Sequence, residues 1–192
     1  MAESRAADRA LVDRARDGDE SAFRELVEKY ESQVAATAIG MLGPGPDAED
    51  VGQETFVRFY GALDKFRGEA SVGTYVTRIA INLSLNASKR RQRSRLRFWS
   101  RDRAEDPPPE PSVDGQAVVD GAARDELVRE AIQRLKPEHR AVVVLRMLEG
   151  HSTRETAELL DIPEGTVLSR LSRGMTRLKS ILVTGMEDED EA

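Results

Sequence analysis

Arginine and hydroxyl side chains near the end of this sequence are spaced in a way that suits DNA recognition. Thr166, Arg170, Arg173 and Arg177 recur at intervals of three and four residues, so they share one face if the segment is helical. Arginine can bind guanine edges or phosphates, and hydroxyl groups can bind either. We expect this face to contact a DNA groove. A basic, solvated helix in a bundle is the alternative.

Two features before this face indicate a helix-turn-helix. Ser152 followed by Glu155 matches a capping box, which begins a helix that we expect to run to Leu160. A short turn at 161–163 separates it from the next helix. An apolar stripe would pack that second helix; its residues are Val167, Leu171, Met175, Leu178 and Leu182. A capping box and a tight turn favour a DNA-binding helix pair, since a plain bundle helix needs neither.

Carboxylates gather near residue 50. Asp47, Glu49, Asp50 and Glu54 lie in a segment that we expect to be helical from about 47 to 63. Carboxylate oxygens can hold a divalent cation, but this spacing spreads the groups along a face, so we expect no metal. Two interpretations remain open. One is a solvated acidic first turn that suits the helix dipole, and the other is a docking face for a basic protein partner.

A basic stretch begins within a third expected helix, which runs from about 72 to 91. Nine Lys and Arg side chains lie between Arg78 and Arg103 against Asp102 alone, so the stretch should attract a polyanion. A solvated basic arm is the alternative. Aromatic rings beside a basic face suit stacking on unpaired bases, although Tyr75 is also in register with the buried stripe. Asn82, on the same polar face as Arg78, is a candidate for reading a base edge.

Other function classes are disfavoured. His139 and His151 lie in different elements, and the chain has no nucleophile–base motif and no phosphate-binding glycine loop, so we expect no enzyme activity and no cofactor. The absence of cysteine excludes disulfides and thiolate zinc sites. No apolar run approaches the roughly 20 residues of a membrane span, and residues 1–20 have no apolar signal core. We expect a cytoplasmic protein without membrane insertion.

The elements that must position these residues are helices. Apolar residues recur at helical spacing from Asp19, a fair N-cap, to about residue 38, and no alternating strand pattern of useful length is present. Four prolines among polar residues at 98–120 indicate a flexible linker, because proline cannot sit in a helix interior. We therefore expect an all-α fold with an N-terminal helical bundle, this Pro-rich linker and a C-terminal four-helix helix-turn-helix domain.

The chain resembles the extracytoplasmic-function sigma factors, the small promoter-recognition subunits of bacterial RNA polymerase. The segments that carry the resemblance, in the family's order and spacing, are 18–23, 47–56, 66–82 and 135–170. The resemblance covers nearly the whole chain outside the linker and the two ends. The regions that it implies are a polymerase-docking and −10 domain at 1–97, a linker at 98–120, a −35 domain at 121–183 and an acidic tail at 184–192.

The resemblance also implies roles for single positions. The residues that would dock on the β′ clamp helices of core polymerase are Asp47, Asp50, Gln53 and Glu54. Those that would hold the melted −10 strand and capture a flipped base are Phe66, Arg67, Gly68, Ser71, Thr74, Tyr75, Arg78, Asn82, Lys89, Arg90 and Arg91. Those that would read the duplex −35 element are Thr166, Ser169, Arg170, Ser172, Arg173 and Arg177. Further implied partners are the polymerase β flap and an anti-sigma factor.

The predicted function is therefore to direct core polymerase to promoters and to help open the −10 region. Binding energy from the subunit would offset the cost of unstacking bases, a few kcal/mol per base, and the chain would do no bond chemistry. The family pattern is altered at three positions: Tyr75 stands where tryptophan is usual, Gly52 where an apolar residue is usual, and Leu168 where a basic residue is common. The alternative is a free-standing helix-turn-helix regulator, which would use the C-terminal module alone and would not need the acidic face.

Overall fold

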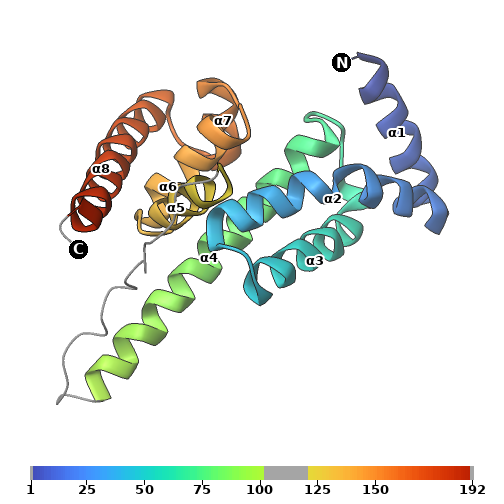
Figure 1. The fold of residues 1–192 in the computed structure, drawn as a ribbon. Helices are drawn as coiled ribbons and strands as arrows, with labels where there is room; N and C mark the ends of the chain where they lie inside the picture. Colours follow the sequence, from blue (N-terminus) through green and yellow to red (C-terminus); the bar gives the residue numbers. More distant parts are fainter. Residues whose placement is uncertain (1, 102–120, 191–192) are drawn as a thin grey trace.

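The part of the chain that the structure describes folds into eight α-helices and contains no strand (Figure 1). The computed structural model describes the backbone of residues 2–101 and 121–190 and the side chains of residues 4–94 and 124–183. In chain order the elements are α1 (Ala2–Arg16), α2 (Glu20–Leu42), α3 (Pro46–Gly61), the 3-10 turn η1 (Leu63–Lys65), α4 (Val72–Arg101), α5 (Gly121–Gln133), α6 (Pro137–Val143), the π-helical turn η2 (Val144–Leu148), α7 (Thr153–Leu160) and α8 (Glu164–Asp190). The all-α prediction is confirmed.

Helices α1 to α4 form the N-terminal bundle. Helix α2 begins as predicted, because the Asp19 carboxylate accepts hydrogen bonds from the backbone N–H groups of Ser21 and Ala22 at 3.0 and 3.2 Å. Pro46 occupies the first turn of α3, where its missing N–H costs nothing. Leu26 and Phe59 are fully buried where α2 and α3 meet α4. This packing fixes the directions in which the polar faces of α3 and α4 point.

Helix α1 is the element that the sequence did not predict. Val12 and Ala15 are buried in the core of the N-terminal bundle, while most of the remaining described side chains of α1 are exposed. Asp8 is also buried, and it accepts hydrogen bonds of 2.5 Å from Lys29 and from the hydroxyl of Tyr30. Burial, together with this bond to Asp8, raises the pKa of Tyr30, which keeps the hydroxyl protonated. The apolar stripe is too narrow to stand out among alternating charges and alanines.

Helix α4 is longer than predicted. Its helical backbone continues to Arg101 instead of ending near residue 91, because no proline or glycine interrupts the chain before that point. Residues 98–101 of the predicted linker therefore belong to α4, and the remainder, 102–120, lies outside the described residues. Helix α3 also ends slightly earlier than predicted, at Gly61, and η1 follows it.

Helices α5 to α8, with η2, form the C-terminal unit. Both halves of the predicted capping box are present, since Ser152 Oγ accepts from the N–H of Glu155 at 3.1 Å and Glu155 accepts from the N–H of Ser152 at 2.8 Å. Met175, predicted in the apolar stripe of α8, is 38% exposed. Gly174 takes the inward position beside it and lets α8 approach α6 so closely that an added Cβ would lie 3.0 Å from Val143 Cγ2. The backbone of the predicted acidic tail continues α8 to Asp190, and its side chains lie outside the described residues.

The N-terminal bundle and the C-terminal unit pack against each other. Helices α6 and α7 contact α4, while α5 and η2 contact the end of α2 (Figure 1). Met41 and Ile81 from the bundle share one buried cluster with Leu135 and Leu145 from the C-terminal unit. We call this packed state the closed arrangement. The sequence predicted two domains and a linker but gave no sign of this shared core.

Each helix in the described parts of the chain is too short or too polar to span a membrane.

Candidate nucleic-acid and polymerase interfaces

The six predicted −35 residues lie along one end of α8. Thr166 and Arg170 are half-buried, and the others, Ser169, Ser172, Arg173 and Arg177, are exposed. The opposite side of the helix is fixed by Val167, which is fully buried against Val142 of α6 and Ala157 of α7. The predicted set is therefore brought together on a rigid helix, as duplex readout requires.

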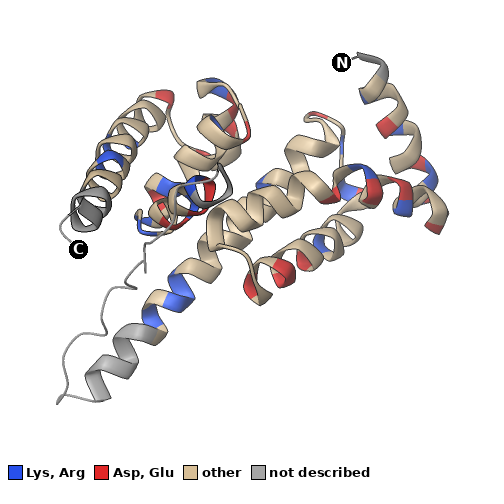
Figure 2. Cartoon of the chain, in the orientation of Figure 1, with Lys and Arg blue, Asp and Glu red and all other residues tan. Residues whose placement is uncertain are grey.

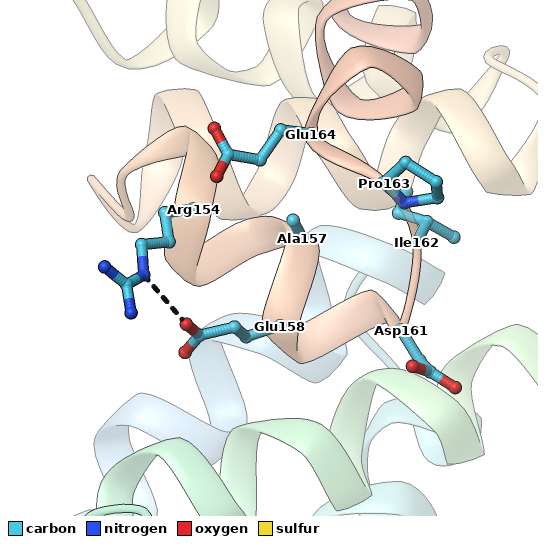
Figure 3. A pocket seen from close by; sticks show the side chains of 7 residues that line it. All are labelled: Arg154, Ala157, Glu158, Asp161, Ile162, Pro163 and Glu164. Atoms are coloured by element: carbon cyan, nitrogen blue, oxygen red, sulfur yellow. Dashed lines mark hydrogen bonds and ion pairs between the residues drawn. The ribbon is translucent and has the colours of Figure 1, made fainter.

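The turn before α8 has a left-handed residue. Asp161 adopts φ 52° as the C-cap of α7, and its N–H and that of Ile162 both bond the carbonyl of Ala157. A hollow of roughly 450 Å³ lies beside this turn, and its lining residues are Arg154, Ala157, Glu158, Asp161, Ile162, Pro163 and Glu164 (Figure 3). Its only basic group, Arg154, is bonded to Glu158 at 3.1 Å. Its carboxylates would repel phosphate, so we expect DNA to meet the outer face of α8 and not this hollow.

The predicted base-capturing loop, residues 66–71, is anchored at both ends. Phe66 packs edge-on against Tyr75, with ring centroids 5.2 Å apart, and also against Phe59. At the other end, the Ser71 hydroxyl accepts from the N–H of Thr74 at 3.1 Å, and the two hydroxyls lie 2.8 Å apart. Between these anchors, Arg67 and Gly68 are exposed, and Gly68 adopts φ 72°, which glycine allows without strain. The tip of the loop is thus accessible while its ends are fixed.

Helix α4 does not present all its predicted −10 residues on one side. Arg78, Asn82 and Lys89 are exposed and share a face. Arg91 lies roughly 140° around the helix from Arg78, and about 20 Å along it. Arg78, Asn82 and Lys89 therefore form one exposed polar stripe along α4, and Arg91 points away from that stripe.

Arg91 contacts the acidic helix, although half of its side chain remains exposed to solvent. Its Nε donates to the carboxylate of Asp47, and its Nη1 donates to the carbonyl of Leu42 at 3.0 Å. A residue expected to hold DNA is thus paired with one expected to dock polymerase. Arg90 beside it is exposed. Only the tertiary structure could reveal this pairing, since the two residues are 44 positions apart.

The predicted docking face of α3 is exposed beyond Asp47. Figure 2 shows acidic residues along the N-terminal half of α3 and basic residues on the neighbouring part of α4. Asp50 and Gln53 are exposed, and Glu54 bonds Arg58 at 2.8 Å. Two exposed apolar residues follow them that were not predicted from the sequence, Val57 at 65% and Tyr60 at 53% exposure. Val57 lies four residues after Gln53, so helical spacing alone could have placed it on this face.

Basic and amide side chains also link the two halves of the closed arrangement. The carbonyls at the end of α2 have no partner within the helix, and the C-terminal unit supplies donors: Gln133 bonds Gly40 O at 2.9 Å and Arg140 bonds Met41 O at 2.6 Å. Arg140 is 9% exposed and also donates to carbonyls of its own unit, including Ile132 and Leu135 at 3.1 and 3.0 Å. Burial, with a smaller effect of the nearby Arg91, lowers its pKa to about 10, so it remains charged at neutral pH.

A predicted −10 residue takes part in the same contact. Arg78 Nη2 donates to the backbone carbonyl of Glu158, in α7, at 2.9 Å. In the closed arrangement this guanidinium is therefore held by the first helix of the helix-turn-helix. Helix α8 packs on α5, α6 and α7 of its own unit, and the described part of its outer face is not held by the N-terminal bundle in the way that Arg78 is held by α7.

Comparisons with known proteins agree with this architecture. The sequence patterns described as Sigma-70 region 2 and Sigma-70 region 4 match residues 26–94 and 125–178. RNA polymerase sigma-H factor of Pseudomonas aeruginosa is 32% identical over 187 residues, covering 91% of this chain and 93% of the relative. ECF RNA polymerase sigma-E factor of Escherichia coli strain K12 is 32% identical over 184 residues, covering 86% and 89%.

Solved structures show the same fold. The structure of CnrH in complex with the cytosolic domain of CnrY matches with a TM-score of 0.64 and 28% identity, over 93% of this chain and 98% of that one. RpoE of Bartonella quintana, solved with the anti-sigma factor NepR, matches with a TM-score of 0.60 over 83% of this chain and 96% of that one, and at 21% identity it supports the fold alone. The chain therefore belongs to the extracytoplasmic-function sigma factors of the sigma-70 family, and it is an RNA polymerase sigma factor that acts in transcription initiation.

Proposed function

We propose that the two halves of this sigma factor divide promoter recognition between them. The domain at 1–97 docks core polymerase and holds the melted −10 strand, and the domain at 121–183 reads the −35 duplex. The chain supplies binding energy and leaves bond chemistry to the polymerase. A sigma factor acts where its polymerase is, which places the protein in the cytoplasm.

The observation that carries the docking proposal is the mixed character of the exposed face of α3. A solvated acidic turn has no need of large apolar side chains, yet Val57 and Tyr60 continue the face of Asp50 and Gln53 into solvent. Apolar residues beside charged ones are typical of protein interfaces, where charge sets orientation and buried apolar area gives affinity. The partner is the basic surface of the β′ clamp helices. Met147 and Leu148, each 55% exposed, offer a second contact suited to the β flap.

The −35 proposal rests on the exposed arginines and hydroxyls of α8. Arg173 and Arg177 can reach guanine edges or phosphates, and the exposed hydroxyl groups of Ser169 and Ser172 precede them on the same helix. Arg173→Ala should cost about 1–3 kcal/mol in discrimination at one base pair of the −35 duplex, as expected for a base-reading arginine. A phosphate contact would instead weaken every sequence equally.

The −10 proposal requires the closed arrangement to open. Arg78 bonds Glu158 O in the closed arrangement, so α7 lies against the part of α4 along which the melted strand would run, and α7 must move away before the strand can follow that face. Polymerase docking, which separates the two halves along the promoter, supplies that opening. An anti-sigma factor acts in the opposite direction by holding the halves together, and the likeness to CnrH, solved with CnrY, supports such a partner.

The test is initiation by purified chain and core polymerase on a promoter library. The wild-type chain should direct sequence-dependent initiation, whereas the double charge reversal Asp50→Lys/Glu54→Lys should lose polymerase binding. The matched control is Glu28→Lys/Glu31→Lys, which changes charge equally on exposed positions of α2. A chain that binds promoter duplexes tightly without polymerase, and tolerates reversal at positions 50 and 54, would be a free-standing regulator instead.

A further inference from the structure

A single arginine of α1 holds the point where the base-capturing loop begins. Arg16 Nε and Nη2 donate to Leu63 O at 3.1 and 2.8 Å, and Nη2 also donates to Phe66 O at 2.7 Å. The acceptors are 47 and 50 residues away in the sequence. Asp13, one turn earlier on α1, holds the other side of the guanidinium at 2.9 Å. The planar fork of arginine can bind two such carbonyls at once, which a lysine cannot do with the same geometry.

These two carbonyls mark a change in the direction of the chain. Leu63 begins η1, and Phe66 is its C-cap, with ψ 109°, where the backbone leaves the turn and becomes extended. Beyond it come the exposed Arg67 and Gly68, and then Ser71, which caps α4. Without Arg16 the Phe66 end of the loop would be held by ring packing and by the bond from the Phe66 N–H to Leu63 O at 3.2 Å within η1. Arg16 adds a donor to the Phe66 carbonyl, so the peptide group at which the loop begins is fixed as well.

We propose that Arg16 is a positioning residue for base capture, acting through the backbone of residues 63–66 on the loop at 66–71. This inference rests on the proposed role of that loop in binding a flipped −10 base. A pocket for an unstacked base gains affinity when its walls are already in place, because ordering the loop then costs nothing at the moment of binding. Arg16 supplies that order from a helix that itself makes no contact with DNA in this mechanism.

A merely structural role is the competing explanation, and the neighbouring arginine separates the two. Arg14 lies on the same helix and joins α1 to α2 through Asp19, at 2.7 and 2.9 Å, without contact to the loop. If general anchoring of α1 matters, Arg14→Ala and Arg16→Ala should act alike. If loop position matters, only Arg16→Ala should impair base recognition.

The experiment uses holoenzyme and single-stranded −10 oligonucleotides that carry each base in turn at the captured position. The readouts are the ratio of dissociation constants for the best and worst base and the fluorescence of 2-aminopurine placed there, which rises when the base unstacks. Arg16→Ala should reduce the ratio about tenfold, equal to ~1.4 kcal/mol. Arg16→Lys should be intermediate, Asp13→Asn should show a smaller loss, and Arg14→Ala should match the wild type. Binding to a −35 duplex should be the same in all variants.

Two results would overturn the inference. One is an unchanged ratio in Arg16→Ala, and the other is an equal loss in Arg14→Ala. If circular dichroism shows that Arg16→Ala alone is poorly folded, the base-recognition ratios of Arg16→Lys and Asp13→Asn test the inference instead, because each of these variants keeps a polar side chain at the substituted position. A wild-type holoenzyme without base preference at any −10 position would instead refute the role of the loop itself. Failure of the proposed function is thereby distinguished from failure of the Arg16 assignment.

Discussion

Substitution of Gly40 should open the closed arrangement. Gly40 lies near the end of α2, at the contact with η2, and an added Cβ would lie 2.9 and 3.2 Å from Cγ1 and Cγ2 of Val144. Val144 is fully buried and β-branched, so its side chain has little freedom to move away. Overpacking of this kind costs about 1–3 kcal/mol in a well-packed core. The cost exists only while the two halves are in contact.

The same change has an opposite, local effect. Alanine stabilises a helix interior by roughly 0.5–1 kcal/mol relative to glycine, and α2 keeps that gain whether the halves are joined or separate. Gly40→Ala should therefore lower the ratio of closed to open molecules by about 5- to 150-fold, the factor that 1–3 kcal/mol gives, without unfolding the N-terminal bundle. Gly52→Ala in α3 is the matched control, because no atom lies within 4 Å of its added Cβ. It should raise the melting temperature and leave the closed arrangement intact.

The assay combines small-angle X-ray scattering with energy transfer between two dyes. The chain has no cysteine, so Glu28→Cys and Lys179→Cys, both exposed, would label the two halves without side reactions. Gly40→Ala should increase the radius of gyration and reduce transfer. Adding Val144→Ala, which removes the two clashing methyl groups, should restore part of the compactness. If Gly40→Ala stays as compact as the wild type and simply melts higher, like Gly52→Ala, the steric argument is refuted.

Two further predictions follow from the buried and capping groups. Arg140→Met should lower the free energy of unfolding in urea by about 3 kcal/mol or more, because each buried carbonyl left without a donor costs roughly 1–3 kcal/mol. The exposed Arg129→Met is the control. A loss in Arg140→Met smaller than the loss in this control would contradict the role of Arg140 as a donor to buried carbonyls. The pKa of Asp19 is held below its ordinary value of 3.8 by bonds from the Ser21 hydroxyl, from Arg14 and from the Ala22 N–H. A carboxyl group whose pKa is lower in the folded than in the unfolded state stabilises the fold at pH values above its unfolded-state pKa, and this stabilisation is lost as the pH falls. Asp19→Asn should therefore flatten the decline in melting temperature between about pH 4 and pH 2. An unchanged slope would show that other carboxyl groups dominate that decline.

The sequence predicted hydrogen bonds correctly where the donor and the acceptor are close in the chain. The Ser152–Glu155 capping box and the Asp19 cap depend on atoms two or three residues apart, so the pattern alone predicts both. The arginine face of α8 follows from helical periodicity, which fixes the direction of each side chain. Met175 shows the limit of that rule, because the close approach allowed by Gly174 shifts the line of contact by one residue.

The sequence by itself determined the class of fold and the family, and it predicted the segments that we expect to meet DNA and polymerase, because periodicity and motif spacing are properties of neighbouring residues. The tertiary structure decided which cations remain free for those partners. Arg78 and Arg91 bond groups 80 and 44 residues away, and Arg140 bonds Met41 O across 99 residues. An arginine that binds a phosphate and one that caps a helix carbonyl have the same side chain. Only the packing of distant segments determines which partner comes within hydrogen-bonding distance.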